Sequence, residues 1–464
     1  MAGSVYTLKN GGESVKNLLS SFMNQFRERE MNRFTKNMWV IVLLSMIGVM
    51  IYPSQILCKT SRISKTSKSH QDAKAPEKVK TAQNEQAPLG SLQCDARSAI
   101  LMDGLTGQVL FEQNSNLKMA PASFVKVMTL YVVLDAIRAG QLKLDDMVTV
   151  SEKAWKRTYK TTSSAMFIKV GERVSIENLI KGVAIASGND ACVALAEHVS
   201  GSEDAFVSKM NEKAKFLGLK DSQFRNSDGM PEVDQYTTAA DMAALAKRYI
   251  NDHPEALVYH STVEFEYNGI KQGNRNTLLQ KNIGVDGLKT GHVQEAGYHL
   301  VATAKRDGQR MIAVVMGCNK MNKRGPEAQK LLEYGFKNFS TVEAVKKGAT
   351  FGPVKVKRGK VNQVSLTAAE DAKVTVAKGK ENLVSAVPQL PPFIVAPVHK
   401  DQVMAKVIIQ NEGKVAKEIN LLAASNVEKS LIPPWPILAG VLAGVVVLVG
   451  FGFWWFRRPS TKRL

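Results

Sequence analysis

Ser123 and Lys126 lie three positions apart in a segment that has few other polar residues. Residues 123–140, SFVKVMTLYVVLDAIRAG, predict a helix that ends at Gly140 and is apolar on nearly every side, hence buried. The spacing places both side chains on one face. A buried lysine is unfavourable as a cation unless it is paired or deprotonated, and an amine beside a hydroxyl is a base–nucleophile pair. A snorkelling lysine with a capping serine explains the same pattern equally well.

Two further motifs follow along the chain. Ser187-Gly188-Asn189 occupies a turn that leads into an apolar helix predicted over 190–201, with Asp190 as a plausible cap. Lys289-Thr290-Gly291 precedes a strong hairpin, 298–317, and is therefore predicted on or beside an edge strand. Each motif is weak alone, because a helix-capping turn or an ordinary strand end explains it.

In this order, S-x-x-K, S-x-N and K-T-G are the signature of penicillin-binding proteins and serine β-lactamases. The chain resembles the low-molecular-mass penicillin-binding proteins of the serine D-alanyl-D-alanine carboxypeptidase type over about residues 95–425. The resemblance also rests on the surrounding segments PASFVKVMT, SSAMFIKVGERV, ASGNDACVALAEHVSGSEDAF, NRNTLL, VDGLKTGH and KRGPEAQKLLEYGF.

The resemblance implies a reaction and the residues that perform it. Ser123 is implied as the nucleophile, Lys126 as the base that takes its proton, and Ser187 as the relay to the departing amine. The backbone N–H groups of Ser123 and His292 are implied as the oxyanion hole. The implied substrate-binding set is Asn189, Lys289, Thr290, Gly291, His292 and Arg275, with Ser163 and Ser164 in a bordering loop.

Some positions depart from the family pattern. Phe124-Val125 stands where relatives often have Leu-Thr, and Val293 stands where a threonine is common. The lost hydroxyls bear on deacylation and on binding of the substrate carboxylate. His292 invites a triad interpretation, although Lys126 already fills the role of the base.

Three alternatives remain open. A class A β-lactamase needs a glutamate in an E-x-x-L-N setting, which the catalytic region lacks. A murein D,D-endopeptidase would use the same machinery, but the appended β domain favours the carboxypeptidase. A catalytically idle wall-binding scaffold would not need a lysine in an apolar helix.

The composition indicates which kinds of binding partner to expect. The 464 residues carry a net charge of +20, which suits anionic lipid or an acidic cell wall. The basic residues are spread along the chain without a zinc-finger spacing, so we expect no nucleic-acid partner. Seven scattered histidines without HExxH and four cysteines without CxxC predict neither metal nor cofactor. The expected partners are peptidoglycan stem peptides, β-lactams as covalent inhibitors, and the membrane.

Two charge-free segments predict membrane contact. Residues 37–58 follow a basic stretch and predict a signal anchor or signal peptide, and residues 435–456 precede the basic tail RRPSTKRL. The positive-inside rule then places both ends in the cytoplasm and 59–430 outside. The expected location is the bacterial cytoplasmic membrane, with the enzyme on its periplasmic or extracellular side.

The expected fold is α+β: a penicillin-binding protein/β-lactamase-like domain with an antiparallel sheet flanked by helices, then a small all-β domain, with membrane helices at both ends. The expected segments, in order, are a cytoplasmic segment 1–36, the anchor 37–58, a disordered linker 59–92, the catalytic domain 93–340, the β domain 341–425, the transmembrane helix 432–456 and the tail 457–464.

Overall fold

The computed structural model describes residues 92–431 and 435–457, and every structural statement below concerns them. All the described residues belong to one compact unit. The predicted N-terminal anchor, 37–58, lies outside the described residues.

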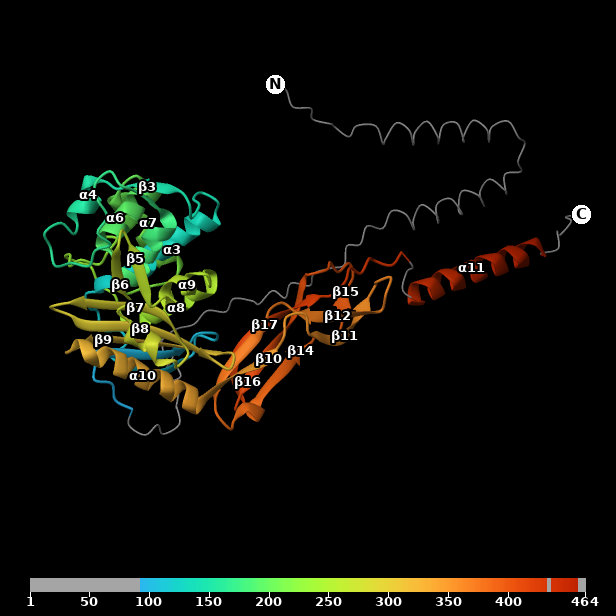
Figure 1. Ribbon diagram of the computed structural model, residues 1–464. Coiled ribbons are helices and arrows are strands. Elements are labelled where there is room, and N and C mark those ends of the chain that lie inside the picture. The colour runs from blue at the N-terminus through green and yellow to red at the C-terminus, as the bar shows by residue number, and fades with distance from the viewer. Residues whose placement is uncertain (1–91, 432–434, 458–464) are drawn as a thin grey trace, which may run out of the picture. The chain divides into compact units, whose positions relative to one another are not determined.

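A five-stranded antiparallel sheet in the order β2-β1-β9-β8-β7 forms the centre of the first part of this unit (Figure 1). The predicted hairpin 298–317 is present, and β8 turns into β9 at Asp307-Gly308; β1 and β2 form a second hairpin. β7, which carries Lys289, is an edge strand as predicted. The strands are β1 (Ser98–Asp103), β2 (Val109–Gln113), β7 (Val285–Val293), β8 (Gly297–Arg306) and β9 (Gln309–Cys318).

Both faces of this sheet are covered by helices. Successive side chains of a strand point to opposite faces, so Ile100 of β1 joins one hydrophobic core and Leu101 joins another. α8 (Ala239–Asp252) lies against the first face and α10 (Met321–Asn338) against the second. A strand buried on both faces gives the site a rigid wall.

A helical cluster holds the remaining motif residues. The predicted helix 123–140 begins as a short 3-10 turn and continues as α3, which is buried along most of its length. The other elements of this part are η1 (Ala122–Phe124), α3 (Val125–Arg138), β3 (Met147–Thr149), α4 (Glu152–Lys156), β4 (Arg173–Ser175), α5 (Ile176–Lys181), η2 (Gly182–Ala186), α6 (Asn189–Ser200), α7 (Glu203–Phe216), α9 (Ala256–Ser261), β5 (Glu264–Tyr267), β6 (Ile270–Gly273) and η3 (Thr277–Lys281).

The prediction that Asp190 caps its helix is wrong. The N-cap of α6 is Gly188, and no side chain caps it. The Asp190 carboxylate instead accepts hydrogen bonds from the backbone N–H groups of Met166, Phe167 and Ile168. The Asp190 carboxylate, which we expected to cap its own helix, therefore binds the backbone of a distant loop instead.

An all-β part follows α10, as predicted. It has a two-stranded sheet, β10-β13, and a six-stranded sheet in the order β14-β16-β17-β12-β11-β15, which share one hydrophobic core. Its elements are β10 (Phe339–Val345), β11 (Thr350–Lys357), β12 (Gln363–Ala368), β13 (Ala372–Ala377), η4 (Glu381–Leu383), β14 (Val384–Gln389), β15 (Ile394–Val395), β16 (Val403–Asn411) and β17 (Lys414–Ala423).

The last described element is α11 (Trp435–Phe456), a helix without a charged residue. Its segment Ile437–Trp455 is long and apolar enough to cross a membrane by length and composition, and none of it is buried by the described residues. An apolar helix left without protein cover fits a lipid environment.

Candidate active site

Ser123 and Lys126 occupy the start of the most deeply buried helix in the cluster. Ser123 lies in η1 and Lys126 in the first turn of α3, where the lysine side chain is 0% exposed. The Lys126 Nζ donates to Ser123 Oγ at 3.1 Å, to Asn189 Oδ1 at 2.7 Å and to the Asp228 carbonyl oxygen at 2.5 Å. The structure thus brings the predicted nucleophile and base into contact.

This arrangement of three acceptors suits an amine that gains and loses a proton. An ammonium group donates all three hydrogens, whereas a neutral amine donates two and offers a lone pair. The two fixed acceptors, on Asn189 and Asp228, can hold both hydrogens of the neutral form, which leaves the lone pair facing Ser123 Oγ. Burial lowers the pKa of Lys126, and the cations of Arg275 and Arg157 lower it further against the opposing effect of Cys192 and Asp228.

Ser187 and Asn189 reach the same centre from a turn with unusual backbone geometry. η2 is a π-helical turn, and it ends at Ser187 in the left-handed conformation, with φ of 62°. Ser187 Oγ donates to Ser123 Oγ at 3.2 Å. A non-glycine residue in this conformation is strained, and such strain is typical of functional positions. Two hydroxyls and one amine therefore converge on one point.

The edge strand β7 forms the opposite wall. Gly291 packs so tightly that a Cβ there would lie 3.3 Å from Ala122 Cβ, so the strand touches the turn that carries Ser123. Lys289 is buried, and its Nζ makes only a long contact, 3.4 Å, with the Thr290 carbonyl oxygen. Burial, followed by the cations of Lys126 and two arginines, holds the pKa of Lys289 well below its usual value.

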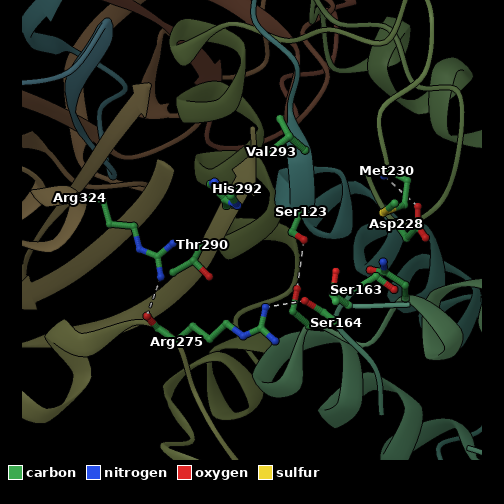
Figure 2. Close-up of a pocket in the computed structure, with 15 residues that line it drawn as sticks. Ser123, Ser163, Ser164, Asp228, Met230, Arg275, Thr290, His292, Val293 and Arg324 are labelled. Atoms are coloured by element: carbon green, nitrogen blue, oxygen red, sulfur yellow. Dashed lines mark hydrogen bonds between the residues drawn. The ribbon is translucent and has the colours of Figure 1, made fainter. Parts of the chain in front are cut away.

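Two guanidinium groups extend this positive region. Arg275 Nη1 donates to Ser164 Oγ at 2.5 Å, and Arg324 Nη2 donates to the Arg275 carbonyl oxygen at 3.3 Å (Figure 2). Within residues 92–431, no carboxylate forms an ion pair with Lys289, Arg275 or Arg324. Three basic side chains without a carboxylate partner create a strong preference for a carboxylate ligand.

Arg324 is a site residue that the sequence reasoning missed. It lies in the first turn of α10, which contains no acidic residue. A cation at a helix N-terminus is electrostatically unfavourable, because the helix dipole is positive there. That unfavourable placement of a cation was the only signal in the sequence, and the structure adds that Arg324 is buried, at 8% exposed.

A cavity of about 220 Å³ opens over these groups. Of the predicted residues, Lys126 and Lys289 lie beneath its surface, whereas His292 stacks on Tyr298 at 4.0 Å between ring centroids and has an exposed side chain. The residues that line the cavity are Ser123, Thr162, Ser163, Ser164, Ser187, Asn189, Asp228, Gly229, Met230, Arg275, Thr290, Gly291, His292, Val293 and Arg324.

Two carboxylates that support the site were also missed. Asp190, fully buried, holds the loop that carries Ser163 and Ser164 by accepting from the backbone amides that follow it. Asp228 forms a two-pronged ion pair with Arg157, with N–O distances of 2.6 and 3.0 Å. That ion pair fixes the backbone whose carbonyl oxygen receives Lys126.

The other reactive side chains do not join the cavity. Cys192, next to Lys126 in space, is fully buried, and burial raises its thiol pKa to about 12. The three cysteines among the described residues are all free and buried. Residues 92–431 and 435–457 contain no group of three histidine, cysteine, aspartate or glutamate side chains able to hold a metal ion.

Comparison with known proteins places this site in a family context. A family model described as D-alanyl-D-alanine carboxypeptidase matches residues 80–320, and one described as penicillin-binding protein 5, C-terminal domain, matches residues 339–429. The chain is 44% identical to D-alanyl-D-alanine carboxypeptidase DacC of Escherichia coli K12, an alignment that covers 72% of this chain and 85% of that one.

Solved structures show the same likeness. Penicillin binding protein 5 from Haemophilus influenzae is similar with a TM-score of 0.69 and 40% identity, covering 74% of this chain and 100% of that one. Penicillin binding protein 6B from Escherichia coli is similar with a TM-score of 0.61 and 35% identity, covering 72% of this chain and 98% of that one.

Proposed function

The chain belongs to the serine D-alanyl-D-alanine carboxypeptidase family of penicillin-binding proteins, and we propose that Ser123 and Lys126 perform its reaction. It is a serine-type carboxypeptidase of the cell wall, and the α+β fold with an appended β domain is confirmed. The observation that supports the assignment of roles is the buried Lys126 amine in hydrogen-bond contact with Ser123 Oγ.

The proposed first step is attack of Ser123 Oγ on the carbonyl carbon of the penultimate D-alanine. The hydroxyl proton moves to the neutral Lys126 amine as the new C–O bond forms. The backbone N–H groups of Ser123 and His292 stabilise the developing oxyanion. The peptide C–N bond then breaks, and the departing amine takes a proton that passes from Lys126 through the Ser187 hydroxyl. Water later hydrolyses the ester on Ser123.

The terminal carboxylate of the substrate is the anion that the positive wall lacks. We place it against Lys289 and Thr290, with Arg275 and Arg324 completing the charge balance, because all four border or underlie one cavity. The substrate would be the stem pentapeptide of peptidoglycan. A β-lactam carries a comparable carboxylate beside its reactive carbonyl and would acylate Ser123 in the same orientation.

The proposed location is the cytoplasmic membrane, with residues 59–430 on its outer side. α11 supports this by its length and its freedom from charge, and Arg457 follows it directly. Protease added to intact spheroplasts should remove the catalytic domain and spare a tag placed after Leu464. Digestion of that tag would contradict the topology.

The enzymatic proposal is tested on muropeptides. The purified full-length chain should convert pentapeptide stems to tetrapeptides with release of free D-alanine, followed by mass spectrometry. The matched variant Ser123→Ala should bind the substrate without an adduct or a product. Cleavage of cross-linked dimers in preference to pentapeptides would instead indicate the endopeptidase.

A further inference from the structure

Few residues of the chain separate the end of the β part from the start of α11. Ser430 is the last residue held in the β part by a backbone hydrogen bond, and α11 begins at Trp435. Five residue steps span at most about 18 Å even when fully extended. Wherever α11 enters a membrane, the end of the β part that carries Ser430 must therefore lie near that surface.

Three segments form this end, which we call the anchor-side rim: residues 357–362, 393–400 and 426–430. The Ser430 N–H donates to the Arg358 carbonyl oxygen, and the Lys360 N–H donates to the Glu428 carbonyl oxygen, both at 2.8 Å. Val398 and Val427 exchange backbone hydrogen bonds. β11, β12 and β15 lie side by side and bring the three segments together (Figure 1).

The rim exposes apolar side chains where a folded domain would normally bury them. Val361, Phe393 and Val395 are 51%, 41% and 50% exposed. Strand alternation explains the last two, because Ile394 and Ala396 between and after them point inward and are buried. Positions 393 and 395 therefore face solvent, where polar residues are usual, yet they carry apolar side chains.

Cations surround these apolar side chains. Within residues 92–431, Lys357, Arg358, Lys400 and Lys429 form no ion pair with an acidic side chain, whereas Lys360 pairs with Glu428. Lys357 Nζ lies 3.4 Å from the centroid of the Phe393 ring, so its ammonium group rests on this exposed ring in a cation–π contact. An apolar patch ringed by free cations is typical of surfaces that bind anionic lipid.

We propose that the anchor-side rim is a membrane-docking surface that rests on the anionic headgroups of the bilayer that α11 crosses. This inference depends on the proposed anchoring by α11. The patch is small, so its own affinity is weak, but tethering by α11 keeps it at a high effective concentration beside the lipid. The docked rim then sets the orientation of the β sheet relative to the membrane.

The short tether favours lipid over other anionic occupants. A wall polymer or a second copy of the chain must diffuse to the rim, whereas the lipid surface is held within about 18 Å by the covalent chain. The opposite end of the sheet serves as an internal reference. Lys347 precedes β11 and Lys414 begins β17, and both are exposed at the end of the strands distant from the rim.

The test uses the full-length chain with Cys58→Ser, reconstituted in nanodiscs, because the described cysteines are buried and stay unlabelled. An environment-sensitive fluorophore is attached at Val361→Cys or, as the control, at Lys414→Cys. Lipids brominated near the headgroup then report contact by quenching, in discs with and without phosphatidylglycerol. D-alanine release, measured on each labelled protein, checks the enzyme separately.

We expect the brominated lipids to quench the fluorophore strongly at position 361 and little at position 414. The signal at 361 should depend on phosphatidylglycerol and weaken between about 0.01 and 1 M salt, where the Debye length falls from about 30 to 3 Å. The combined substitutions Lys357→Gln, Arg358→Gln, Lys400→Gln and Lys429→Gln should remove most of it, whereas Lys347→Gln with Lys414→Gln, probed at 361, should not.

Equal quenching at 361 and 414 would overturn the proposal, as would a probe at 361 that responds to poly(glycerol phosphate) and not to the discs. A chain that fails to enter nanodiscs at all would refute the anchoring by α11 on which the rim depends. Loss of D-alanine release in the parent protein would count against the enzymatic assignment alone.

Discussion

Replacement of Lys126 tests the mechanism most directly. Lys126→Arg keeps a cation but removes the base, because a guanidinium group is not deprotonated in proteins. Lys126→Met removes both the charge and the base while it keeps a long, flexible side chain of similar shape. The two variants differ in charge and share only the missing lone pair, so a common defect would identify the base as the lost function.

The size of the effect follows from the three contacts of Lys126 Nζ. Loss of a positioned general base lowers the rate by about 10²- to 10⁴-fold, and we expect both variants to acylate more slowly by at least this range. In Lys126→Met, Asn189 Oδ1 and the Asp228 carbonyl oxygen lose a donor, at about 1–3 kcal/mol each. Removal of a fully buried amine offsets part of that loss, so the protein should remain folded.

The assay is the second-order rate of acylation by a penicillin, followed by intact-protein mass across pH. The wild-type rate should rise with pH as Lys126 loses its proton, with an apparent pKa below that of a free lysine. Neither variant should show this rise, and Ser123→Ala should form no adduct. Near-normal acylation by Lys126→Arg or Lys126→Met would refute the role of Lys126 as base, and His292 would become the first candidate.

Three further variants probe the supporting structure. Asp190→Asn removes acceptor capacity from the amides of 166–168, so hydrogen exchange there should accelerate and acylation should fall by about 10-fold or more. Gly229→Ala would place a Cβ 1.8 Å from the Ala122 carbonyl oxygen at a φ of 84°, so we expect about 1–3 kcal/mol lower unfolding free energy by denaturant titration and a weaker adduct. Lys289→Met should lose substrate binding yet raise the thermal midpoint at neutral pH. Burial depresses the pKa of Lys289 in the folded protein, so the unfolded chain binds a proton that the folded protein releases. Lys289 therefore lowers the free energy of unfolding at neutral pH, and this loss disappears only as the pH rises toward the pKa of the unfolded chain.

The sequence predicted those features that depend on local pattern. The apolar run around Lys126 predicted its burial, and the hairpin after Lys289 predicted an edge strand, because periodicity and turn residues encode both. Features that depend on tertiary contacts were missed or mistaken. Asp190 was assigned to the helix end because the amides that it binds lie 22 to 24 positions earlier in the chain.

The local sequence pattern also did not predict where the backbone is strained or which residues line the cavity. Gly182 begins the π-helical turn η2 and Gly188 follows Ser187, but these glycines predict only a turn, whereas the π-helical geometry and the left-handed conformation of Ser187 depend on the surrounding packing. Arg324 enters the site from α10, far along the chain from Ser123. The Arg324 guanidinium group lies beside Arg275 only because α10 packs against the sheet.

The positive wall and the base form one electrostatic system. The Lys126 cation lowers the pKa of Lys289, and repulsion between two charges is mutual, so the two buried amines disfavour holding protons at the same time. A substrate carboxylate beside Lys289 favours the proton on that amine, which in turn favours the neutral form of Lys126. Binding of the correct anion thus prepares the base next to Ser123. Acylation by Lys289→Met should consequently show a higher apparent pKa than the wild type, and an unchanged or lower value would show that the two amines titrate independently.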